Sequence, residues 1–548
     1  MDICAVSVEI GIMSDFTVVP RGGAEEVGRS CYHLQADDHD YLVDCGLKQS
    51  APPEYPILRG VDPGQIDAVF ITHAHIDHIG GLPIAEHQDL LADDASIFMT
   101  RPTNALASIL LHDSLQIHKQ ETAELNQPQQ FTATDVKRVL ARVTSVGYDR
   151  DHHLNITYEF GDAAHLLGSA WLAIEHADRR VVFSGDLGGR SAHLGDIDHP
   201  PKADELLLES TYGDTMQHRS FTDARTELYR QAKQAHASGI PVLIPTFAVG
   251  RAQEILQIFR EREPDLRDAV DGEPSIVYDG MITESMPVYE VFCQDAFMGE
   301  SILNYRINSG DVEPFTPECA WTPDTMDERE RLLTGNEAPI IVAPSGMLTG
   351  GWSPYYLRDL GQHYDEARVL FIGYQAEGTP GRQLLDAVGD VADLRVTALP
   401  AGEEYDPTTD EFVFQEQEIR VPTEWMREIG GMSGHAAAND LLAFAREADP
   451  QGISLIHGPP SASAHLREYL SGNTDAKTIQ VAQRLEPIEI ESGSDAETES
   501  ERKNHVEHAA SGSDSGTDVE QLLQRQDQLE AELEAIRTDI ERLVEANR

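Results

Sequence analysis

Residues 72–81 place four potential metal ligands within six positions, and this cluster constrains the fold more than any other part of the chain. The segment reads THAHIDHIGG and follows an apolar run typical of a buried strand. His73 and His75 can converge on one cation from an extended backbone, while Asp77 and His78 can face a second cation one turn further on. Because packing alone gives no reason for this pattern, the segment predicts a metal site at the end of a strand.

Short β-rich runs alternate with helix-like stretches along most of the chain, which is an α/β pattern. The early strand-like runs are 41–46, 68–75 and 180–186. A second α/β block has strand runs at 241–245 and 339–346 and helix patterns at 223–235 and 252–261. After it, the run 454–458 again carries a histidine at its end, as in the first block. We therefore expect one domain that is interrupted by an inserted one.

The chain of 548 residues carries a formal net charge of −54, from 95 acidic and 41 basic residues spread along its whole length. Self-repulsion of this size opposes compaction and repels an anionic substrate in ordinary cytosol. Molar salt shortens the screening length to about 3 Å and removes most of both penalties. We interpret the composition as that of a halophile that accumulates salt. The alternative is an acidic mesophilic protein that has a negatively charged surface for binding a partner.

The cysteines are odd in number and form no C-x-x-C pair, so neither a disulfide framework nor a thiolate zinc site is indicated. They are Cys4, Cys31, Cys45, Cys293 and Cys319. No apolar run approaches the roughly 20 residues of a membrane span. We expect a cytoplasmic protein with no membrane association. Since strand-like sequence begins only after Met13, residues 1–12 are not expected to belong to the native protein.

The last 63 residues, 486–548, change character twice. Residues 486–517 are rich in Ser, Glu, Asp and Gly and are predicted to be a disordered acidic linker. Residues 518–548 have apolar side chains on alternating three- and four-residue steps, which predicts a coiled-coil helix for self-association or for a partner helix. The alternative is a lone amphipathic helix that docks on its own body.

The H-x-H-x-D-H pattern resembles the signature of the metallo-β-lactamase superfamily, and further motifs follow in the order of that family. Asp44 is similar to its first motif, a residue that supports the ligand loop; His165 is similar to the third motif and Asp186 to the fourth. The resemblance implies two Zn²⁺ ions. It assigns His73, His75 and His165 to the first ion, Asp77, His78 and a later histidine to the second, and Asp186 to both. Ala164 precedes His165 where the family often has glycine.

Three later segments resemble the motifs of β-CASP nucleases: 209–213 is similar to motif A, 433–436 to motif B and 455–458 to motif C. The resemblance implies that His457 completes the second zinc site. It also implies that His435, oriented by Glu209, is the general acid that protonates the leaving 3′-oxygen. We expect Asp77 to be both a catalytic residue and a metal ligand.

Residues 245–254, 343–351 and 373–382 resemble the endonuclease subunit of the cleavage and polyadenylation specificity factor and its archaeal relatives. This implies a zinc-dependent ribonuclease that cuts single-stranded RNA to 5′-phosphate and 3′-hydroxyl ends. One alternative is a 5′-to-3′ exonuclease similar to ribonuclease J, and another is a catalytically inactive scaffold subunit. DNA-directed β-CASP nucleases generally replace the motif C histidine, so His457 favours RNA.

The predicted fold is a metallo-β-lactamase αββα sandwich with an inserted β-CASP α/β domain. We expect the sandwich over 13–208 and 396–485 and the inserted domain over 209–395. Ser345, Gly346 and Arg251 are candidates for contact with RNA phosphates, or else a tight turn and a structural arginine. Residues 399–425 are expected to be an acidic insertion. A homodimer or larger assembly is expected through the β-CASP region or the coiled coil.

Overall fold

A computed structural model describes residues 16–491, except residues 51, 125, 149, 151, 271, 294–295, 336, 374 and 399–414. The predicted coiled coil, almost all of the predicted linker and residues 1–12 lie outside the described residues. The chain forms two compact units. The first contains the described residues of Met1–His218, Asp295–Ser301 and Gly434–Ser492, and the second contains those of Arg219–Gln294 and Ile302–Ser433. The domain boundaries expected at 209 and 396 stay predictions.

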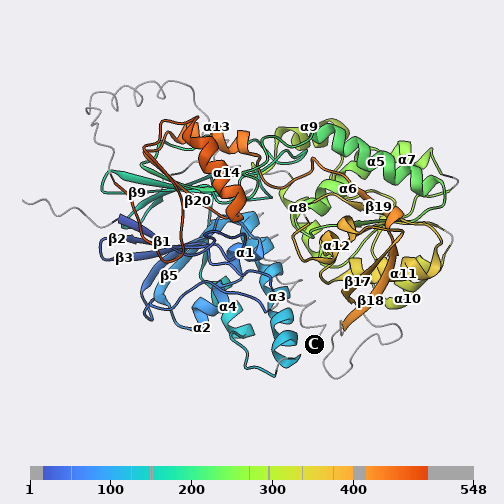
Figure 1. The fold of residues 1–548 in the computed structure, drawn as a ribbon, viewed down its shortest axis with the longest axis horizontal. Coiled ribbons are helices and arrows are strands. Elements are labelled where there is room, and N and C mark those ends of the chain that lie inside the picture. Colours follow the sequence, from blue (N-terminus) through green and yellow to red (C-terminus); the bar gives the residue numbers. More distant parts are fainter. Residues whose placement is uncertain are drawn as a thin grey trace, which may run out of the picture. The chain divides into compact units, whose positions relative to one another are not determined.

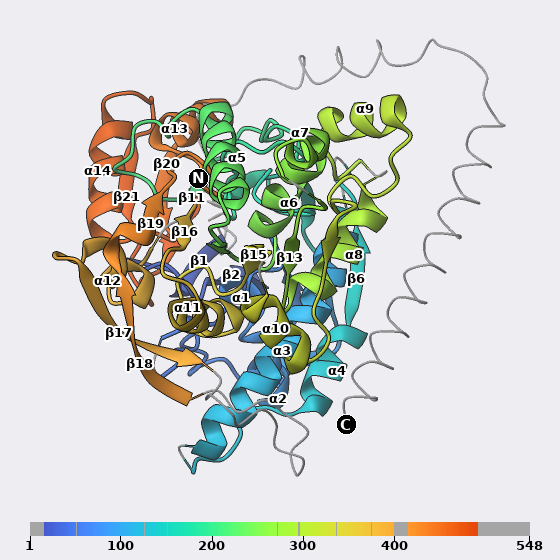
Figure 2. The ribbon, with the colours of Figure 1, turned by 90° about the vertical axis from the view of Figure 1, so that its right-hand side faces the viewer.

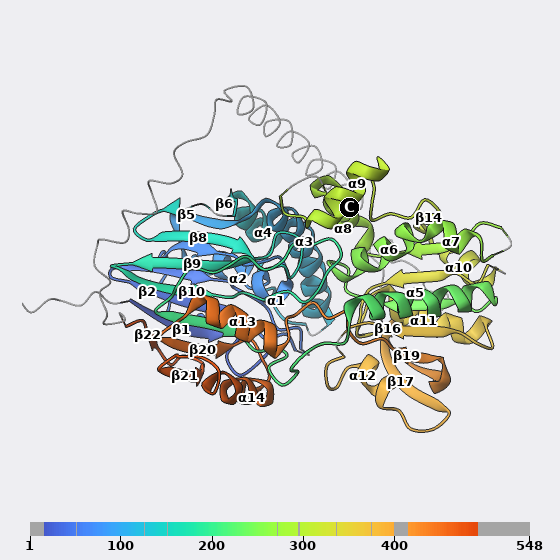
Figure 3. The same ribbon diagram turned by 90° about the horizontal axis from the view of Figure 1, so that it is seen from above.

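Two seven-stranded sheets form the centre of the first unit. One sheet has the order β22 (Ile488–Glu489), β1 (Phe16–Gly22), β2 (Cys31–Ala36), β3 (His39–Val43), β4 (Ile66–Phe70), β5 (Leu91–Thr100) and β6 (Val143–Val146). The other has the order β21 (Thr478–Val481), β20 (Gly452–Ile456), β11 (Glu205–Glu209), β10 (Arg179–Phe183), β9 (Ala170–His176), β8 (Thr157–Asp162) and β7 (His152–His153). Figure 3 shows β8, β9 and β10 side by side. Each sheet has antiparallel strands on one side and parallel strands on the other.

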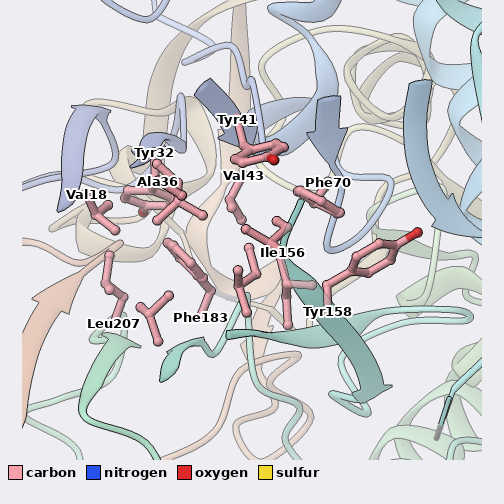
Figure 4. Close-up of a cluster of buried hydrophobic side chains, with 14 of the residues drawn as sticks. Val18, Tyr32, Ala36, Tyr41, Val43, Phe70, Ile156, Tyr158, Phe183 and Leu207 are labelled. Carbon is pink, nitrogen blue, oxygen red and sulfur yellow. The ribbon is translucent and has the colours of Figure 1, made fainter. Parts of the chain in front are cut away.

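Apolar side chains from both sheets meet between them and form the main core of this unit. Tyr32 and Phe70 point from the first sheet toward Phe183 and Tyr158 of the second (Figure 4). The ring centroids of Phe70 and Tyr158 are 4.8 Å apart, a separation at which aromatic pairs attract each other. This dry layer fixes the two sheets against each other, and with them the loops at the strand ends.

Helices cover both outer faces of the sandwich (Figure 1). Two helices, α1 (Ile76–Ile79) and α2 (Leu82–His87), lie between β4 and β5 of the first sheet in the sequence, and α3 (Arg101–Glu124) and α4 (Ala133–Ala141) lie between β5 and β6. On the second sheet, α13 (Ala438–Ala448) and α14 (Pro460–Ser471) bury Leu441 and Leu466 against Leu206 of β11. The layers are therefore helix, sheet, sheet and helix, and the predicted αββα sandwich is confirmed.

The second unit is built on a six-stranded parallel sheet. Its order is β14 (Ala320–Trp321), β13 (Ile276–Tyr278), β15 (Ile340–Ala343), β12 (Val242–Pro245), β16 (Arg368–Phe371) and β19 (Met426–Glu428). Strands β12 and β15 are buried along their whole length, as expected for a parallel sheet that helices cover on both faces. This is the α/β architecture expected for the inserted block.

Eight helices of the described chain lie between residues 221 and 386. They are α5 (Phe221–Ala237), α6 (Arg251–Glu261), α7 (Glu263–Arg267), α8 (Ile282–Phe292), α9 (Glu300–Ser309), α10 (Met326–Thr334), α11 (Trp352–His363) and α12 (Pro380–Asp386). None of the helices in the described ranges is both long and apolar enough to cross a membrane.

A two-stranded arm, β17 (Val391–Ala398) and β18 (Gln415–Pro422), lies beside α11 and α12 (Figure 2). It is followed by the short helix η1 (Thr423–Trp425). The described part of the expected acidic insertion is therefore a paired strand and one helical turn. Its exposed face carries cross-strand ion pairs, with 3.0 Å between Arg420 and Asp393 and 3.4 Å between Arg395 and Glu418.

Glu205 is a buried carboxyl in the second sheet of the sandwich, and it makes the stability of this unit depend on pH. It is 7% exposed and accepts a 2.7 Å hydrogen bond from Ser454 Oγ. Burial raises the pKa of Glu205 to about 7. Because this value exceeds that of an unfolded glutamate, its contribution to stability is complete below about pH 4.5 and is lost as the pH rises through about 7.

We expect Glu205→Gln, which cannot ionise, to be more stable than the native chain at pH 8 by about 1–3 kcal/mol, with little difference near pH 4.5. Denaturant unfolding at the two pH values measures the difference. Glu468→Gln, at an exposed position of α14, controls for the loss of one negative charge. An equal effect of Glu205→Gln at both pH values would contradict the assignment.

Candidate metal centre

Seven side chains that can bind a cation gather where strands of both sheets end. The structure brings together two groups, one of His73, His75, His165 and Asp186 and one of Asp77, His78 and His457. His73 and His75 follow β4, and the one-turn helix α1 carries the next two ligands. His165, Asp186 and His457 lie after β8, β10 and β20. All seven predicted metal-ligand residues are therefore close together, although they span 385 positions between His73 and His457.

The first group is held together by three imidazoles that point at a common centre. His75 Nδ1 lies 3.1 Å from His73 Nε2 and 3.1 Å from His165 Nε2. Asp186 Oδ2 is 3.6 Å from His73 Nε2 and 3.8 Å from His165 Nε2. Three nitrogens and one carboxylate oxygen in this arrangement are the ligand set that zinc accepts.

The second group shares the same carboxylate. Asp186 Oδ2 lies 3.4 Å from His78 Nε2 and 3.6 Å from His457 Nε2. Asp77 Oδ2 is 3.7 Å from His457 Nε2. A carboxylate within 4 Å of ligands from both groups can bridge two cations, which is the role that the sequence resemblance assigned to Asp186.

In three of the imidazoles, those of His78, His457 and His165, the nitrogen that faces away from the centre is held by another residue. Asp44 Oδ2 lies 2.7 Å from His78 Nδ1, and the Asp44 carboxylate also accepts bonds from the backbone N–H and hydroxyl of Thr72. Ser30 Oγ lies 2.7 Å from His457 Nδ1. The carbonyl of Gly434 accepts from His165 Nδ1 at 2.8 Å. Such outer bonds orient metal-binding histidines, because they fix the tautomer and the ring plane.

Several polar atoms at the centre are buried without a hydrogen-bond partner. They are Nε2 of His78, Nε2 of His457 and Oδ1 of Asp186. A cavity of about 10 Å³, lined by these three residues together with Asp44 and Thr72, lies next to them. Buried polar atoms without partners are costly unless a ligand or ion satisfies them. These atoms therefore fit a bound cation.

The electrostatics of the first metal group agree with cation binding. Burial lowers the pKa of His73 and His165 well below the usual histidine value and that of His75 to about 4, so these imidazoles are neutral as metal ligands must be. Burial opposes the charge of Asp186, but the charges of His457 and His78 hold the pKa of Asp186 well below its usual range. The Asp186 carboxylate is thus negatively charged and is surrounded by imidazole nitrogens.

The backbone around the centre is strained at residues that are not glycine. Asp44 (φ 57°), Ala164 (φ 53°) and His457 (φ 43°) all adopt the left-handed conformation. Such residues cost about 1–2 kcal/mol each and persist where the surrounding structure dictates them. Ala164 therefore takes the conformation for which the family often uses glycine. Gly46 is required for a different reason, because a Cβ there would lie 1.7 Å from the carbonyl oxygen of Asp77.

His435 and Glu209 lie at the edge of the metal groups. His435 Nδ1 is 3.3 Å from Glu209 Oε1 and 3.9 Å from Asp186 Oδ2. Glu209 is fully buried and its carboxylate also accepts from the backbone N–H groups of Leu187 and Thr211. Burial opposes a charge on His435, but the charge and hydrogen bond of Glu209 outweigh it and raise the pKa of His435 to about 9. The pair predicted from motifs A and B is therefore in contact.

The three residues predicted to contact RNA belong to the second unit. Ser345 Oγ accepts from the backbone N–H groups of Thr349 and Gly350, so Ser345 and Gly346 form part of a tight turn after β15. Arg251 is 7% exposed and its Nη1 donates to the carbonyl of Met432 at 3.3 Å. This contact suits the structural arginine that was the alternative interpretation, and RNA contact by all three residues stays a prediction.

Ser30 is a supporting residue that sequence reasoning missed. It lies between β1 and β2 and is fully buried. Its bond to His457 joins residues 427 positions apart, and a serine between a loop and a strand has no pattern that marks it. The carbonyl of Gly434 was missed as well, because backbone acceptors carry no sequence signal.

Family comparisons agree with this geometry. Residues 24–86 match the metallo-beta-lactamase superfamily, residues 252–384 match the Beta-Casp domain, and residues 418–482 match the Zn-dependent metallo-hydrolase RNA specificity domain. The fold and the histidine and aspartate centre thus define a metal-dependent hydrolase of the metallo-β-lactamase type.

Relatives identify the branch of this superfamily. Ribonuclease TTHA0252 of Thermus thermophilus is 30% identical over 449 residues, which cover 80% of this chain and 93% of that protein. Transcription termination factor FttA of Methanocaldococcus jannaschii is 30% identical over 464 residues, 80% of this chain and 66% of the relative. Probable RNase MJ4 of the same organism is 28% identical, with coverages of 85% and 99%. The chain belongs to the β-CASP family of the metallo-β-lactamase superfamily, beside these ribonuclease-named and archaeal proteins.

Asp44→Asn tests the support of the second metal group. Asparagine keeps the shape but replaces one acceptor oxygen by an N–H₂ group, so it cannot accept from both Thr72 and His78 as the carboxylate does. We expect the affinity for the second cation to fall about 10–100-fold. Competition with a chelator, followed by elemental analysis, measures it. Asp37→Asn, at an exposed carboxylate paired with His176, is the matched control, and equal affinities in the two variants would disprove the role of Asp44.

Proposed function

We propose that the protein is a zinc-dependent endoribonuclease that hydrolyses single-stranded RNA to 5′-phosphate and 3′-hydroxyl ends. The observation that carries the proposal is the single oxygen of Asp186 that lies within 4 Å of ligand nitrogens from both metal groups. The names of the relatives, two of which are ribonucleases, support RNA as the substrate.

His73, His75, His165 and Asp186 would hold one Zn²⁺, and Asp77, His78, His457 and Asp186 the other. When bound, two such ions lower the pKa of a water and stabilise both the attacking and the leaving oxygen of an in-line displacement at phosphorus. Imidazole and carboxylate ligands suit zinc, and the buried, unpartnered nitrogens of His78 and His457 are its natural contacts. Because a water, and not the 2′-hydroxyl of the substrate, attacks phosphorus in the proposed reaction, RNA preference would have to arise from the substrate cleft.

His435 is assigned the role of general acid. Glu209 holds Nδ1, which fixes the ring plane and favours a protonated imidazole, and Nε2 is the nitrogen that we assign to the leaving 3′-oxygen. The His435 side chain lies 3.9 Å from Asp186 and is 21% exposed, which supports contact between its ring and a substrate atom. Glu209 acts through His435 and touches no reacting atom, so it is a positioning residue.

His435→Ala should keep both metals and slow RNA cleavage about 10²–10⁴-fold, the usual range for general acid catalysis. Single-turnover cleavage of a defined RNA gives the rate, and elemental analysis gives the metal content. Glu209→Gln should reproduce part of the loss, because the amide cannot stabilise a protonated ring. An unchanged rate in His435→Ala would remove His435 from the mechanism.

The closest rival is a 5′-to-3′ exonuclease similar to ribonuclease J. An RNA with a 5′-triphosphate separates the two, since an endonuclease cuts it internally at the same rate as a 5′-monophosphate RNA. End-mapping of the products shows the cut sites. We expect internal cuts, and a processive ladder that requires a 5′-monophosphate would instead support the exonuclease.

A catalytically inactive scaffold subunit is a second rival. Such subunits lose metal ligands, whereas all seven ligand positions are occupied here by histidine or aspartate. Two zinc ions per chain, together with loss of cleavage on chelation and recovery on adding Zn²⁺, are the expected results. The expected assembly into dimers and the cytoplasmic location stay predictions.

A further inference from the structure

His218 makes a hydrogen bond to the backbone of the candidate acid. Its Nε2 lies 3.0 Å from the carbonyl oxygen of His435, and because a carbonyl can only accept, Nε2 carries the proton. The His218 ring is half-buried and packs edge-on against Tyr212, with 4.8 Å between the ring centroids. Tyr212 itself lies 6.3 Å from the ring of His435. His218 is therefore fixed in position by its own neighbours.

The segment around His435 is anchored on two sides. On one side, the backbone of Ala436 donates to the carbonyl of Leu187, and the carbonyl of Gly434 accepts from Gly189. On the other side, the backbone of Ala438 donates to the carbonyl of Thr215 at 2.9 Å. The bond from His218 belongs to this second side, and it acts on the carbonyl of the residue whose ring must reach the substrate.

The chain crosses between the two units at the same place. It leaves the first unit after His218 and, apart from the short stretch Asp295–Ser301 that also belongs to the first unit, returns to it at Gly434. The bond from His218 to the carbonyl of His435 therefore joins the last residue before the insertion to the second residue after it. The position of the His435 backbone thus depends on how the segment that ends at His218 lies against the segment that begins at Gly434.

We propose that His218 is a positioning residue for His435, acting through this hydrogen bond. The inference rests on the proposed function, in which His435 donates a proton to the leaving oxygen. A proton donor must lie within hydrogen-bond distance of its target, and an error of about 1 Å in its position reduces the rate about 10²-fold. His218 affects catalysis through the position of His435 and contacts neither metal group.

His218→Phe keeps a ring against Tyr212 and removes the N–H donor, whereas His218→Gln keeps an N–H donor. On RNA, we expect His218→Phe to lower kcat about 10–100-fold with little change in KM and with two metals still bound. His218→Gln should restore most of the rate. His199→Phe replaces an exposed histidine that pairs with Glu447 and should leave the rate unchanged.

A substrate with a p-nitrophenolate leaving group distinguishes positioning of the acid from general damage, since this group leaves without a proton. His218→Phe and His435→Ala should both hydrolyse bis(p-nitrophenyl) phosphate at close to the native rate. On RNA, the double variant should be no slower than His435→Ala alone.

Equal losses of His218→Phe on both substrates, or additive losses in the double variant, would overturn the inference. A native rate of His218→Phe on RNA would do so as well. If His218→Phe gives one of these contradicting results while His435→Ala slows RNA cleavage as expected, His435 remains the general acid and only the positioning role of His218 is disproved. If His435→Ala is as fast as the native chain, the acid assignment fails together with the inference.

Discussion

The carboxylate of Asp186 is the group on which the arrangement of the site depends. Five imidazoles, those of His73, His78, His165, His435 and His457, place a nitrogen within 4 Å of its Oδ2. A buried carboxylate is costly in isolation, and a cluster of buried histidines is costly if they are charged. The buried carboxylate and the buried histidines therefore stabilise each other, and two cations bound between them would satisfy the polar atoms of both. The sandwich makes this possible, because β4, β8, β10 and β20 end at one edge and bring their loops together there.

The candidate metal ligands are held rigid by hydrogen bonds from residues that surround them and do not belong to the metal groups. Asp44 fixes His78 and the backbone of Thr72, Ser30 fixes His457, and the carbonyl of Gly434 fixes His165. Left-handed backbone at Asp44 and His457 shows that these positions are imposed by the surrounding structure against local preference. The dry core between the two sheets provides the stability that sustains such strain.

Much of this site could be predicted because its residues follow strands in recognisable order. H-x-H-x-D-H and the three later motifs each carry chemistry-bearing side chains, so the seven candidate ligands and the pair of His435 and Glu209 could be named, and the structure brings them together. The αββα layers could also be predicted, through the resemblance of these motifs to the metallo-β-lactamase superfamily. Ser30 and His218 could not, since their partners are a histidine 427 positions away and a backbone carbonyl. The burial of Arg251, the first residue of α6, depends on tertiary packing that the local sequence does not reveal.

The bond between Ser30 and His457 has a consequence for the nascent chain during translation. The second metal group needs His457, whose orientation depends on a serine from the first turn between strands, so neither half of the sandwich holds a complete centre. A nascent polypeptide that ends before residue 435 lacks both His435 and His457. Under the proposed function, hydrolytic activity is therefore withheld from unfinished chains that have not yet reached His457.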